Sequence, residues 1–290
     1  MSAVPHVMIV GPGRAGLALG YALVHAEAVQ RLTVCGRRLD PPSHPLFTQN
    51  TARYVFGLER PTEGTAAVFL AVPDDVIPEM AHALAGQGPA PNGCAAFHLS
   101  GAVSTDVLAP LHASGYAIGS FHPLQSLAHP VRSAERIPGS YVAVTGSPGA
   151  VAVARRLASA LGSPVLSVPE SRRPLYHAAA VMAANYLPVL LDLAARLLER
   201  AGVDSSEALP ALLPLVEGSL ANIREVGLGA AVTGPVARGD VETVDLHLRA
   251  LEPDDRVLYA VLARRLADVV GDRLDPGVRD ELVRRLDAAV

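Results

Sequence analysis

The chain has 290 residues and a formal net charge of -4 at pH 7; half of its residues are hydrophobic and 18% are charged. This length favours two domains over one, the composition excludes a disordered protein, and the weak negative charge gives no basic field to attract nucleic acid. The chain contains no lysine, so its 24 basic side chains are all arginines and chemistry that requires a lysine, such as a Schiff base or a P-loop, is excluded.

The first part of the chain alternates short apolar segments with helical patterns, which is typical of a parallel sheet wound by helices. Residues 39–51 contain three prolines and are predicted to form a loop instead of a crossover helix. Strands are predicted at residues 7–10, 32–35, 53–56, 67–72, 95–99, 117–121, 141–145 and 165–168. Helices are predicted at residues 15–26, 75–85, 105–113 and 150–161.

Beyond Pro169 the strand-like segments end and the chain has helical periodicity. The predicted fold class is α/β: a Rossmann-type, doubly wound, mainly parallel sheet in residues 1–169, then an all-helical substrate and dimerisation domain in residues 170–290. Residues 178–191 are apolar on nearly every face, so we expect them to be buried centrally or between subunits. Helices are predicted at residues 172–201 with a kink at Pro188, and at 205–226, 236–238, 240–251, 253–270 and 276–288.

The cysteines and the apolar segments indicate a cellular compartment. Cys35 and Cys94 lie in predicted buried strands, which favours a reducing environment over a disulfide framework. The first apolar segment has no cationic region before it, so we do not expect a signal peptide. The most apolar later stretch is interrupted by Asn185, Pro188 and Asp192, so we expect no transmembrane helix and a cytoplasmic protein.

A glycine-rich motif follows the first predicted strand and opens a helix, which is the context of a dinucleotide-binding loop. Its first glycine makes the tight turn, its second lets the backbone approach a pyrophosphate, and its third lets the helix pack on the strand. The helix N-terminus would then hold the phosphates. The alternative is a glycine-rich turn without a ligand. The residues of the motif are Gly11, Pro12, Gly13, Arg14, Ala15 and Gly16.

The end of the second predicted strand distinguishes NAD from NADP. An acidic residue at this position binds the ribose hydroxyls of NAD, whereas here Gly36 is followed by Arg37 and Arg38. Two guanidinium groups would bind a 2′-phosphate, so NADPH is predicted to be preferred over NADH. A solvated basic turn is the alternative. After the fourth strand, Ala71, Val72 and Pro73 are predicted to contact the nicotinamide or its ribose.

Two loops at the same sheet edge carry most of the reactive side chains. His98 and Ser100 follow the fifth strand, and His122, Gln125 and Ser126 follow the sixth. Hydride transfer requires a proton exchange, so His122 is predicted to be the general acid or base, with Ser100 orienting the substrate and Gln125 and Ser126 binding its polar substituents. Each histidine could instead be a hydrogen-bonded structural residue. A metal site is not expected, because His98 and His122 lack the spacing and companion ligands of a zinc site.

In the helical domain, Tyr176, His177 and Asn185 are polar residues on an otherwise apolar helix. They are predicted to face the active-site cleft, with satisfaction of the helical core as the alternative. Farther on, Thr233 and Arg238 belong to a corner between helices that could bind an anionic group of the substrate or simply turn the chain.

Together these motifs resemble the 6-phosphogluconate dehydrogenase-like superfamily, whose members include pyrroline-5-carboxylate reductases, ketopantoate reductases and prephenate dehydrogenases. The chain is most similar to an uncharacterised bacterial family with a Rossmann-like N-terminal domain and a helical C-terminal domain. The resemblance implies NADP binding, a homodimer built through the helical domains and an active site between domains. It is carried by residues 11–16, 98–101, 121–126, 176–177 with 185, and 233–240.

The resemblance also supports His122, because the His122-Pro123 pair is similar to the loop that supplies a catalytic histidine in prephenate dehydrogenases. Ketopantoate reductases use a catalytic lysine that this chain lacks, so their mechanism does not transfer intact. The predicted function is NADP-dependent hydride transfer to or from a small carbonyl, imine or hydroxy-acid substrate between the two domains. The alternatives are an NADP-binding sensor or structural protein without catalysis, and a metal-assisted hydrolase.

Overall fold

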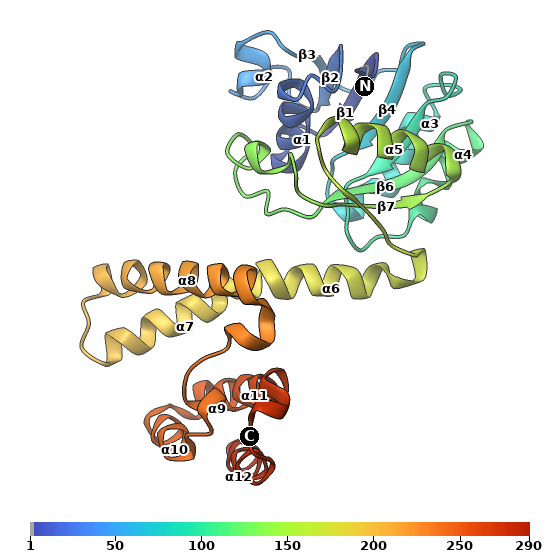
Figure 1. The fold of residues 1–290 in the computed structure, drawn as a ribbon. Helices are drawn as coiled ribbons and strands as arrows, with labels where there is room; N and C mark the ends of the chain where they lie inside the picture. Colours follow the sequence, from blue (N-terminus) through green and yellow to red (C-terminus); the bar gives the residue numbers. More distant parts are fainter. Residues whose placement is uncertain (1–2) are drawn as a thin grey trace. The chain divides into compact units, whose positions relative to one another are not determined.

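The computed structural model describes residues 3–290 and contains two compact units (Figure 1). The first unit ends at Asn185 and the second begins at Tyr186. Helix α6 (Arg173–Ala184) groups with the N-terminal unit, so this division lies farther along the chain than residue 169, where the strand patterns end.

An eight-stranded sheet forms the centre of the N-terminal unit, and each predicted strand is present in it. The strand order is β3-β2-β1-β4-β5-β6-β7-β8, and neighbouring strands are parallel except for the antiparallel pair β6 and β7. The predicted doubly wound, mainly parallel sheet is therefore confirmed. The strands are β1 (His6–Val10), β2 (Leu32–Gly36), β3 (Arg53–Phe56), β4 (Thr65–Leu70), β5 (Ala95–His98), β6 (Ala117–Pro123), β7 (Val142–Gly146) and β8 (Val165–Ser167).

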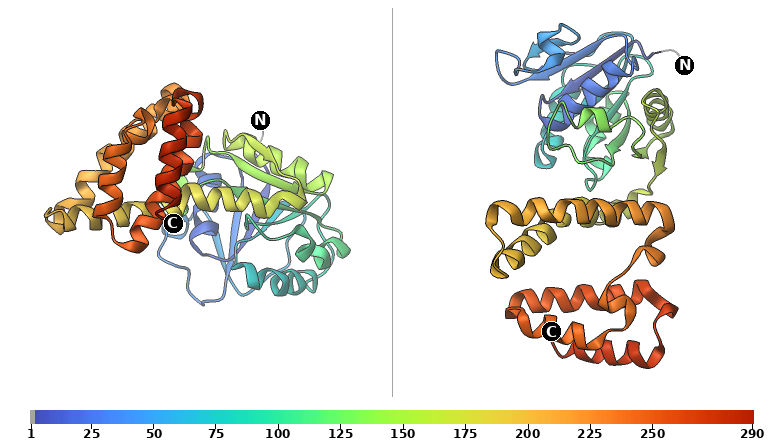
Figure 2. Two further views of the ribbon diagram at one scale, coloured as in Figure 1. Left: turned by 90° about the horizontal axis from the view of Figure 1, so that it is seen from below. Right: turned by 60° about the vertical axis from the view of Figure 1, so that its left-hand side comes forward.

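Helices bury both faces of this sheet (Figures 1 and 2). Helices α1 (Arg14–His25) and α5 (Pro148–Ala160) cover one face, where Val7 and Ile9 of β1 point. Helices α3 (Ile77–Ala85) and α4 (Ala109–Ala113) cover the other face, where Met8 and Val10 point. Burial on both faces explains why the strands are continuous apolar runs in the sequence.

The proline-rich stretch at residues 39–51 contains one short helix, α2 (Pro45–Thr48), where a loop was expected. The His44 imidazole accepts a hydrogen bond from the Leu46 N–H at 3.3 Å and so caps this helix. Pro45 lies in its first turn, where the missing N–H breaks no helical hydrogen bond. The prolines therefore exclude a crossover helix but allow a single turn.

The C-terminal unit is all-helical, as predicted. Helices α7 and α8 lie side by side (Figure 2), and the last four helices enclose a small core that includes Val244, Ala260 and Leu282. The side chains of Asp240 and Asp275 cap α10 and α12. The helices are α7 (Tyr186–Arg200), α8 (Ser205–Ala231), α9 (Pro235–Arg238), α10 (Val241–Ala250), α11 (Pro253–Val270) and α12 (Pro276–Asp287).

Two helical segments differ from their predictions. The helix expected at 172–201 is interrupted at Asn185, between α6 and α7, and not at Pro188 itself. Pro188 has no N–H to donate to the carbonyl one turn earlier, so the interruption falls on the preceding turn. The helix expected at 205–226 continues to Ala231 after a non-helical residue, Gly227, whose φ of 77° favours glycine.

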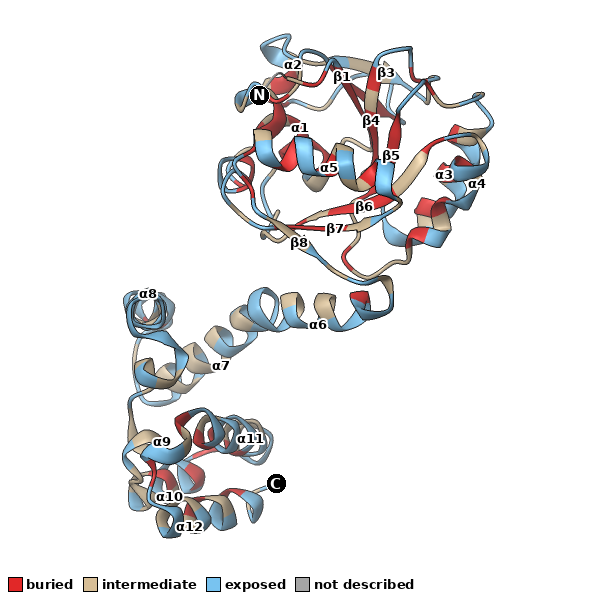
Figure 3. Cartoon of the chain, turned by 45° about the vertical axis from the view of Figure 1, so that its right-hand side comes forward, coloured by how far each residue is buried: buried red, intermediate tan, exposed pale blue. Residues whose placement is uncertain are grey.

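The apolar residues of α6, α7 and α8 are exposed within a single chain (Figure 3). Leu175 and Met182 of α6 are each 68% exposed, and Leu215 of α8 is 67% exposed. The sequence predicted central burial or burial between subunits, and burial within the chain is not observed. By length and composition, the segment Glu170–Arg200 would also suffice to cross a membrane, because an 18-residue window within it has a mean hydropathy of 1.6. One such helix is weak evidence for a membrane protein, because interface helices have the same composition.

Candidate active site

The glycine loop between β1 and α1 has the close backbone approaches that the motif predicts. Gly11 has a φ of +111°, and a side chain there would overlap the Ala71 carbonyl oxygen. A side chain at Gly16 would overlap the Gly11 carbonyl oxygen, so α1 packs directly on the loop. At Gly13, which caps α1, the nearest atom to an added Cβ is 4.0 Å away. The loop therefore leaves room in front of the helix N-terminus, where a phosphate would bind.

A cleft of about 770 Å³ lies beside this loop. Most of the predicted cofactor residues line it, while Arg14 and Ala15 lie in the first turn of α1 and Gly16 is buried behind the loop. The sequence analysis did not single out Tyr54 of β3, Met80 of α3 or Glu79 beside it, because the second wall of the cleft comes from elements without a motif. The predicted lining residues are Gly11, Pro12, Gly13, Gly36, Arg37, Arg38, Ala71, Val72 and Pro73.

The end of β2 has no space for an acidic side chain. A Cβ on Gly36 would lie 2.5 Å from the Tyr54 hydroxyl and 2.9 Å from the Pro12 ring. The Tyr54 hydroxyl donates a hydrogen bond to the Arg38 carbonyl at 2.7 Å, which fixes this wall. Arg37 and Arg38 are exposed, and within residues 3–290 no hydrogen bond or ion pair occupies either guanidinium. Both groups are free to bind an anion.

His122 lies near the carboxyl end of β6 and forms a hydrogen-bonded pair with Tyr176 of α6. The distance between His122 Nδ1 and the Tyr176 hydroxyl is 2.6 Å. Burial, followed by the neighbouring His177 and Arg173, lowers the pKa of His122 to about 4. Burial raises the pKa of Tyr176 to about 12. At neutral pH both groups are therefore neutral, and the phenol can donate to Nδ1 when the imidazole carries its proton on Nε2.

His177 and His98 complete a cluster around this pair. The rings of His177 and His122 are 6.0 Å apart between centroids. Both rings pack against Gly101, where an added Cβ would lie 2.5 Å from His177 Nδ1 and 3.1 Å from His122 Nε2. His98, at the end of β5, is fully buried, and neither of its ring nitrogens has a hydrogen-bond partner. Burial, with Arg173 and His122 nearby, lowers the pKa of His98 to about 3.

The predicted polar residues beside these histidines are already bonded to the protein. The Ser100 hydroxyl donates to Asp74 at 2.9 Å and accepts hydrogen bonds from two N–H groups of its own loop. Gln125 donates to the Arg136 carbonyl at 3.3 Å and accepts from the Ser126 N–H at 2.9 Å. These contacts shape the two loops, and substrate contacts by Ser100, Gln125 and Ser126 stay predictions.

The remaining predicted residues are not part of this cluster within the N-terminal unit. Asn185 is exposed at the end of the N-terminal unit. Thr233 and Arg238 belong to the C-terminal unit, and Arg238 is 3.8 Å from the Asp240 carboxylate. The structure thus brings together His98, Ser100, His122, Tyr176 and His177. Within residues 3–290, no group of three or more histidine, cysteine or acidic side chains is placed to hold a metal ion.

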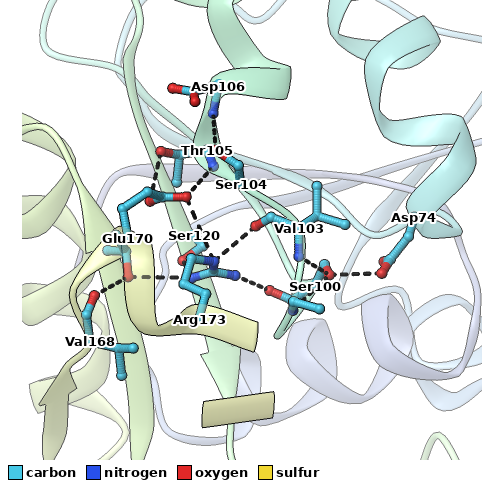
Figure 4. A network of polar contacts seen from close by, with 12 residues as sticks. Asp74, Ser100, Val103, Ser104, Thr105, Asp106, Ser120, Val168, Glu170 and Arg173 are labelled. Carbon is cyan, nitrogen blue, oxygen red and sulfur yellow. Dashed lines mark hydrogen bonds and ion pairs between the residues drawn. The ribbon is translucent and has the colours of Figure 1, made fainter. Parts of the chain in front are cut away.

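Sequence analysis missed the most buried charged residue, Arg173 at the start of α6 (Figure 4). Its side chain is 1% exposed and lies among carbonyl and hydroxyl groups of the loop after β5 and of strands β6 and β7. The pattern Arg172-Arg173 resembles an ordinary solvated basic pair at a helix start, so no sequence signal distinguishes the buried arginine from the exposed one.

Acid should destabilise the protein through His98 and His122. Both have folded-state pKa values below the ordinary value of 6.5, so the unfolded chain binds protons first as the pH falls. The contribution of these histidines to the free energy of unfolding is fully present above pH 6.5. It decreases as the pH falls toward their folded-state pKa values, by about 2 kcal/mol per histidine between pH 7.5 and pH 5. Urea unfolding at both pH values measures this loss. In a His98→Leu protein the loss should be smaller by about 2 kcal/mol, and an unchanged pH dependence would contradict the assignment.

The cofactor cleft and the histidine cluster lie at one edge of the sheet. Strands β2, β1, β4, β5 and β6 are parallel neighbours, so their carboxyl ends share that edge. The cleft lies at the ends of β2, β1 and β4, and the cluster lies at the ends of β5 and β6. This edge is where ligands bind in doubly wound folds.

Two family models match the chain. A Rossmann-like domain matches residues 2–123, and a domain of unknown function, DUF2520, matches residues 140–266. Among curated proteins, none matches the sequence.

Several solved structures have a similar fold. A protein from Thermotoga maritima has a TM-score of 0.70 and 21% identity, covering 91% of this chain and 98% of that one. A candidate NADP oxidoreductase from Bacteroides fragilis has a TM-score of 0.68 and 22% identity over the same shares. A pyrroline carboxylate reductase from Plasmodium falciparum, solved with NADP bound, has a TM-score of 0.59 and 11% identity, covering 100% and 99%. At these identities the likeness shows a fold that oxidoreductases use.

Proposed function

We propose that this chain, which joins a Rossmann-like domain to a DUF2520 domain, is an NADP-dependent oxidoreductase acting on a small carbonyl, imine or hydroxy-acid substrate. One observation carries the proposal: the His122–Tyr176 pair lies at the same sheet edge as a cleft built around a dinucleotide-type glycine loop. A hydride donor bound along that edge would have a proton donor within the same structural unit.

The residues fit a nicotinamide dinucleotide. Gly13 and the first turn of α1 would hold the pyrophosphate, and Val72 and Pro73 would contact the nicotinamide end. When bound, NADPH supplies a hydride from the nicotinamide ring, and everything else in the reaction depends on the protein. The protein must hold the substrate, exclude water and supply or accept one proton.

The His122–Tyr176 pair is suited to move that proton. In the tautomer that serves this role, the neutral imidazole carries its proton on Nε2 and Nδ1 accepts from the Tyr176 hydroxyl. During reduction, Nε2–H gives its proton to the substrate oxygen or nitrogen, while Nδ1 receives the phenol proton of Tyr176. The histidine stays neutral, the transient charge resides on the phenolate, and solvent restores the phenol. In the oxidation direction the same transfers run in reverse.

The preference for NADPH is supported by the end of β2. Gly36 has no room for the carboxylate that would bind the ribose hydroxyls of NAD, because Tyr54 and Pro12 occupy that space. Arg37 and Arg38 line the cleft with free guanidinium groups, and these can form charge-assisted hydrogen bonds to a 2′-phosphate.

The test of the proposed function combines binding and turnover. Fluorescence titration with NADPH and NADH gives the two affinities, and NADPH absorbance in the presence of a panel of oxo acids, aldehydes, ketones and cyclic imines reports reduction. We expect tight NADPH binding and consumption with at least one substrate class. Binding without consumption across the panel would favour a sensor, and hydrolysis that depends on an added divalent metal would favour the hydrolase alternative.

We further propose that the chain forms a homodimer through its helices and is cytoplasmic. The exposed leucine and methionine side chains of α6, α7 and α8 form more apolar surface than a monomer usually exposes. Burial against a second copy would account for the composition that also suits a membrane span. Both cysteines are free and buried, which fits a reducing compartment.

Light scattering at micromolar concentration should give about twice the chain mass of 30.1 kDa. Replacement of Leu215, which is 67% exposed on α8, by glutamate should weaken the dimer by introducing a charge into its apolar contact. Leu246→Glu is the matched control, because Leu246 is 60% exposed on α10, outside these three helices. A monomer at all concentrations, or equal effects of the two substitutions, would contradict the proposed interface.

A further inference from the structure

The guanidinium of Arg173 bonds to the loop after β5 and to strands β6 and β7, beside the histidine cluster (Figure 4). It donates to the Val103 carbonyl at 2.8 Å and to the Ser100 carbonyl at 2.6 Å, both in the loop after β5. It also donates to the Ser120 hydroxyl of β6 and, at 3.3 Å, to the Thr145 hydroxyl of β7. A planar fork of fixed geometry therefore holds one loop and two strands at once.

The Arg173 contacts in the loop after β5 and on β6 are a short distance along the chain from residues of the cluster. Ser100 precedes Gly101, against which the rings of His122 and His177 pack. Ser120 lies two residues before His122 on the same strand, so both side chains are on one face of β6. Arg173 itself lies three and four residues before Tyr176 and His177, a spacing that places all three on one face of α6.

A second set of contacts, made by the Glu170 carboxylate, fixes the start of α6. Glu170 lies just before the helix, and its carboxylate is 4.0 Å from the Arg173 guanidinium. The same carboxylate accepts hydrogen bonds from the Thr105 N–H at 2.9 Å and the Thr105 hydroxyl at 3.1 Å. The buried guanidinium of Arg173 thus has one carboxylate 4.0 Å away, and its hydrogen-bond acceptors are neutral oxygens (Figure 4).

We propose that Arg173 is the positioning residue of the active site: its guanidinium holds α6, β6 and the loop after β5 in the register that joins His122 to Tyr176. The inference rests on the proposed function for its catalytic meaning and on the contacts of Arg173 for its geometry. The arginine touches neither the cofactor cleft nor the Tyr176 hydroxyl, so it acts through the residues it holds.

The charge of Arg173 has a second consequence. His122 faces the titratable groups of His98, Tyr176 and His177, and its charged neighbour is Arg173, while the carboxylates of Asp74 and Glu170 are engaged by Ser100 and Thr105. A permanent cation beside the histidines opposes a second positive charge on them. Arg173 therefore helps to keep the imidazole of His122 neutral, which leaves Nδ1 available to the Tyr176 phenol.

The experiment compares Arg173→Gln, Arg173→Lys and, as a matched control, Arg172→Gln in the full-length protein. Arg172 is the neighbouring arginine and is exposed, so its substitution removes the same charge without touching the network. NADPH affinity is measured first, because it reports folding of a cleft that Arg173 does not line. NMR titration of the His122 imidazole and the pH dependence of kcat are then measured for each protein.

Arg173→Gln should raise the titration midpoint of His122 by about one pH unit and lower kcat by about 10- to 100-fold, with NADPH affinity unchanged. Arg173→Lys keeps the charge without the planar fork, so the midpoint should return toward its original value while kcat stays low. Arg172→Gln should change neither quantity.

Three outcomes would overturn the assignment. These are an unshifted His122 titration in an Arg173→Gln protein that binds NADPH normally, full kcat in Arg173→Lys, and equal effects of Arg172→Gln. If Arg173→Gln does not fold, Arg173→Lys carries the test of position through kcat. Because the NMR titration needs no turnover, a shift of His122 without any enzymatic reaction would leave the positioning role intact and refute the proposed function instead.

Discussion

A His122→Asn protein is expected to bind NADPH with unchanged affinity and to turn over substrate about 10²- to 10⁴-fold more slowly. Asparagine keeps a polar group of similar shape near Tyr176 but has no titratable proton, so the transfer through Nε2 is lost. The loss should appear in kcat, because the proton moves in the transition state and not on binding. Stopped-flow measurement of the chemical step would show the same loss if product release limits the unsubstituted protein.

His98→Asn is the internal control for this substitution. His98 is fully buried with no hydrogen-bond partner, so its replacement should affect stability more than turnover. Tyr176→Phe should lower turnover in the direction of His122→Asn, since it removes the 2.6 Å contact that supplies the second proton. If the His98 change abolished turnover and the His122 change did not, the acid would have to be assigned to the loop after β5. Loss of NADPH binding together with folding in His122→Asn would show that His122 is structural.

The double substitution Arg37→Ala and Arg38→Ala should weaken NADPH binding by about 2 to 4 kcal/mol, which is about 30- to 1,000-fold in Kd. Each guanidinium is free in this structure, so both can form charged hydrogen bonds to a 2′-phosphate without breaking an existing contact. NADH has no such phosphate, so its affinity should change little. Titration of both cofactors against both proteins measures the difference.

The salt dependence of NADPH binding provides the control for the double substitution of Arg37 and Arg38. Charged contacts to a phosphate weaken as ionic strength rises, so NADPH affinity in the unsubstituted protein should fall more steeply with salt than in the double variant. Equal losses for NADPH and NADH would mean that the two arginines shape the cleft and do not recognise the phosphate.

The fold could be predicted from the sequence because the local residue patterns agree with the burial of the strands in the folded sheet. Strands buried on both faces appear as continuous apolar runs, and the eight predicted segments all became strands of one sheet. The glycine loop was equally predictable, since Gly11 has a positive φ and a side chain at Gly16 would overlap the Gly11 carbonyl of the same loop. In a parallel sheet the carboxyl ends of neighbouring strands share one edge, so the predicted strands already place His98 and His122 there.

What the sequence could not predict depends on contacts between distant segments. Arg173 and Arg172 are indistinguishable in the sequence, and burial separates them after α6 packs on the loop following β5. Ser100 was predicted to orient the substrate, but its hydroxyl donates a hydrogen bond to Asp74, which follows another strand. Tyr54 closes the cofactor cleft from β3, where nothing in its local pattern marks it.

Every residue that lines the cofactor cleft lies between Val10 and Met80, whereas the histidine cluster and its arginine lie between His98 and His177. Under the proposed function, recognition of the cofactor and movement of the proton are thus encoded in consecutive, non-overlapping stretches of the gene. A recombination event in the intervening stretch would exchange one without disturbing the other. The proposed function therefore allows the coenzyme preference and the proton-transfer residues to change in separate evolutionary steps.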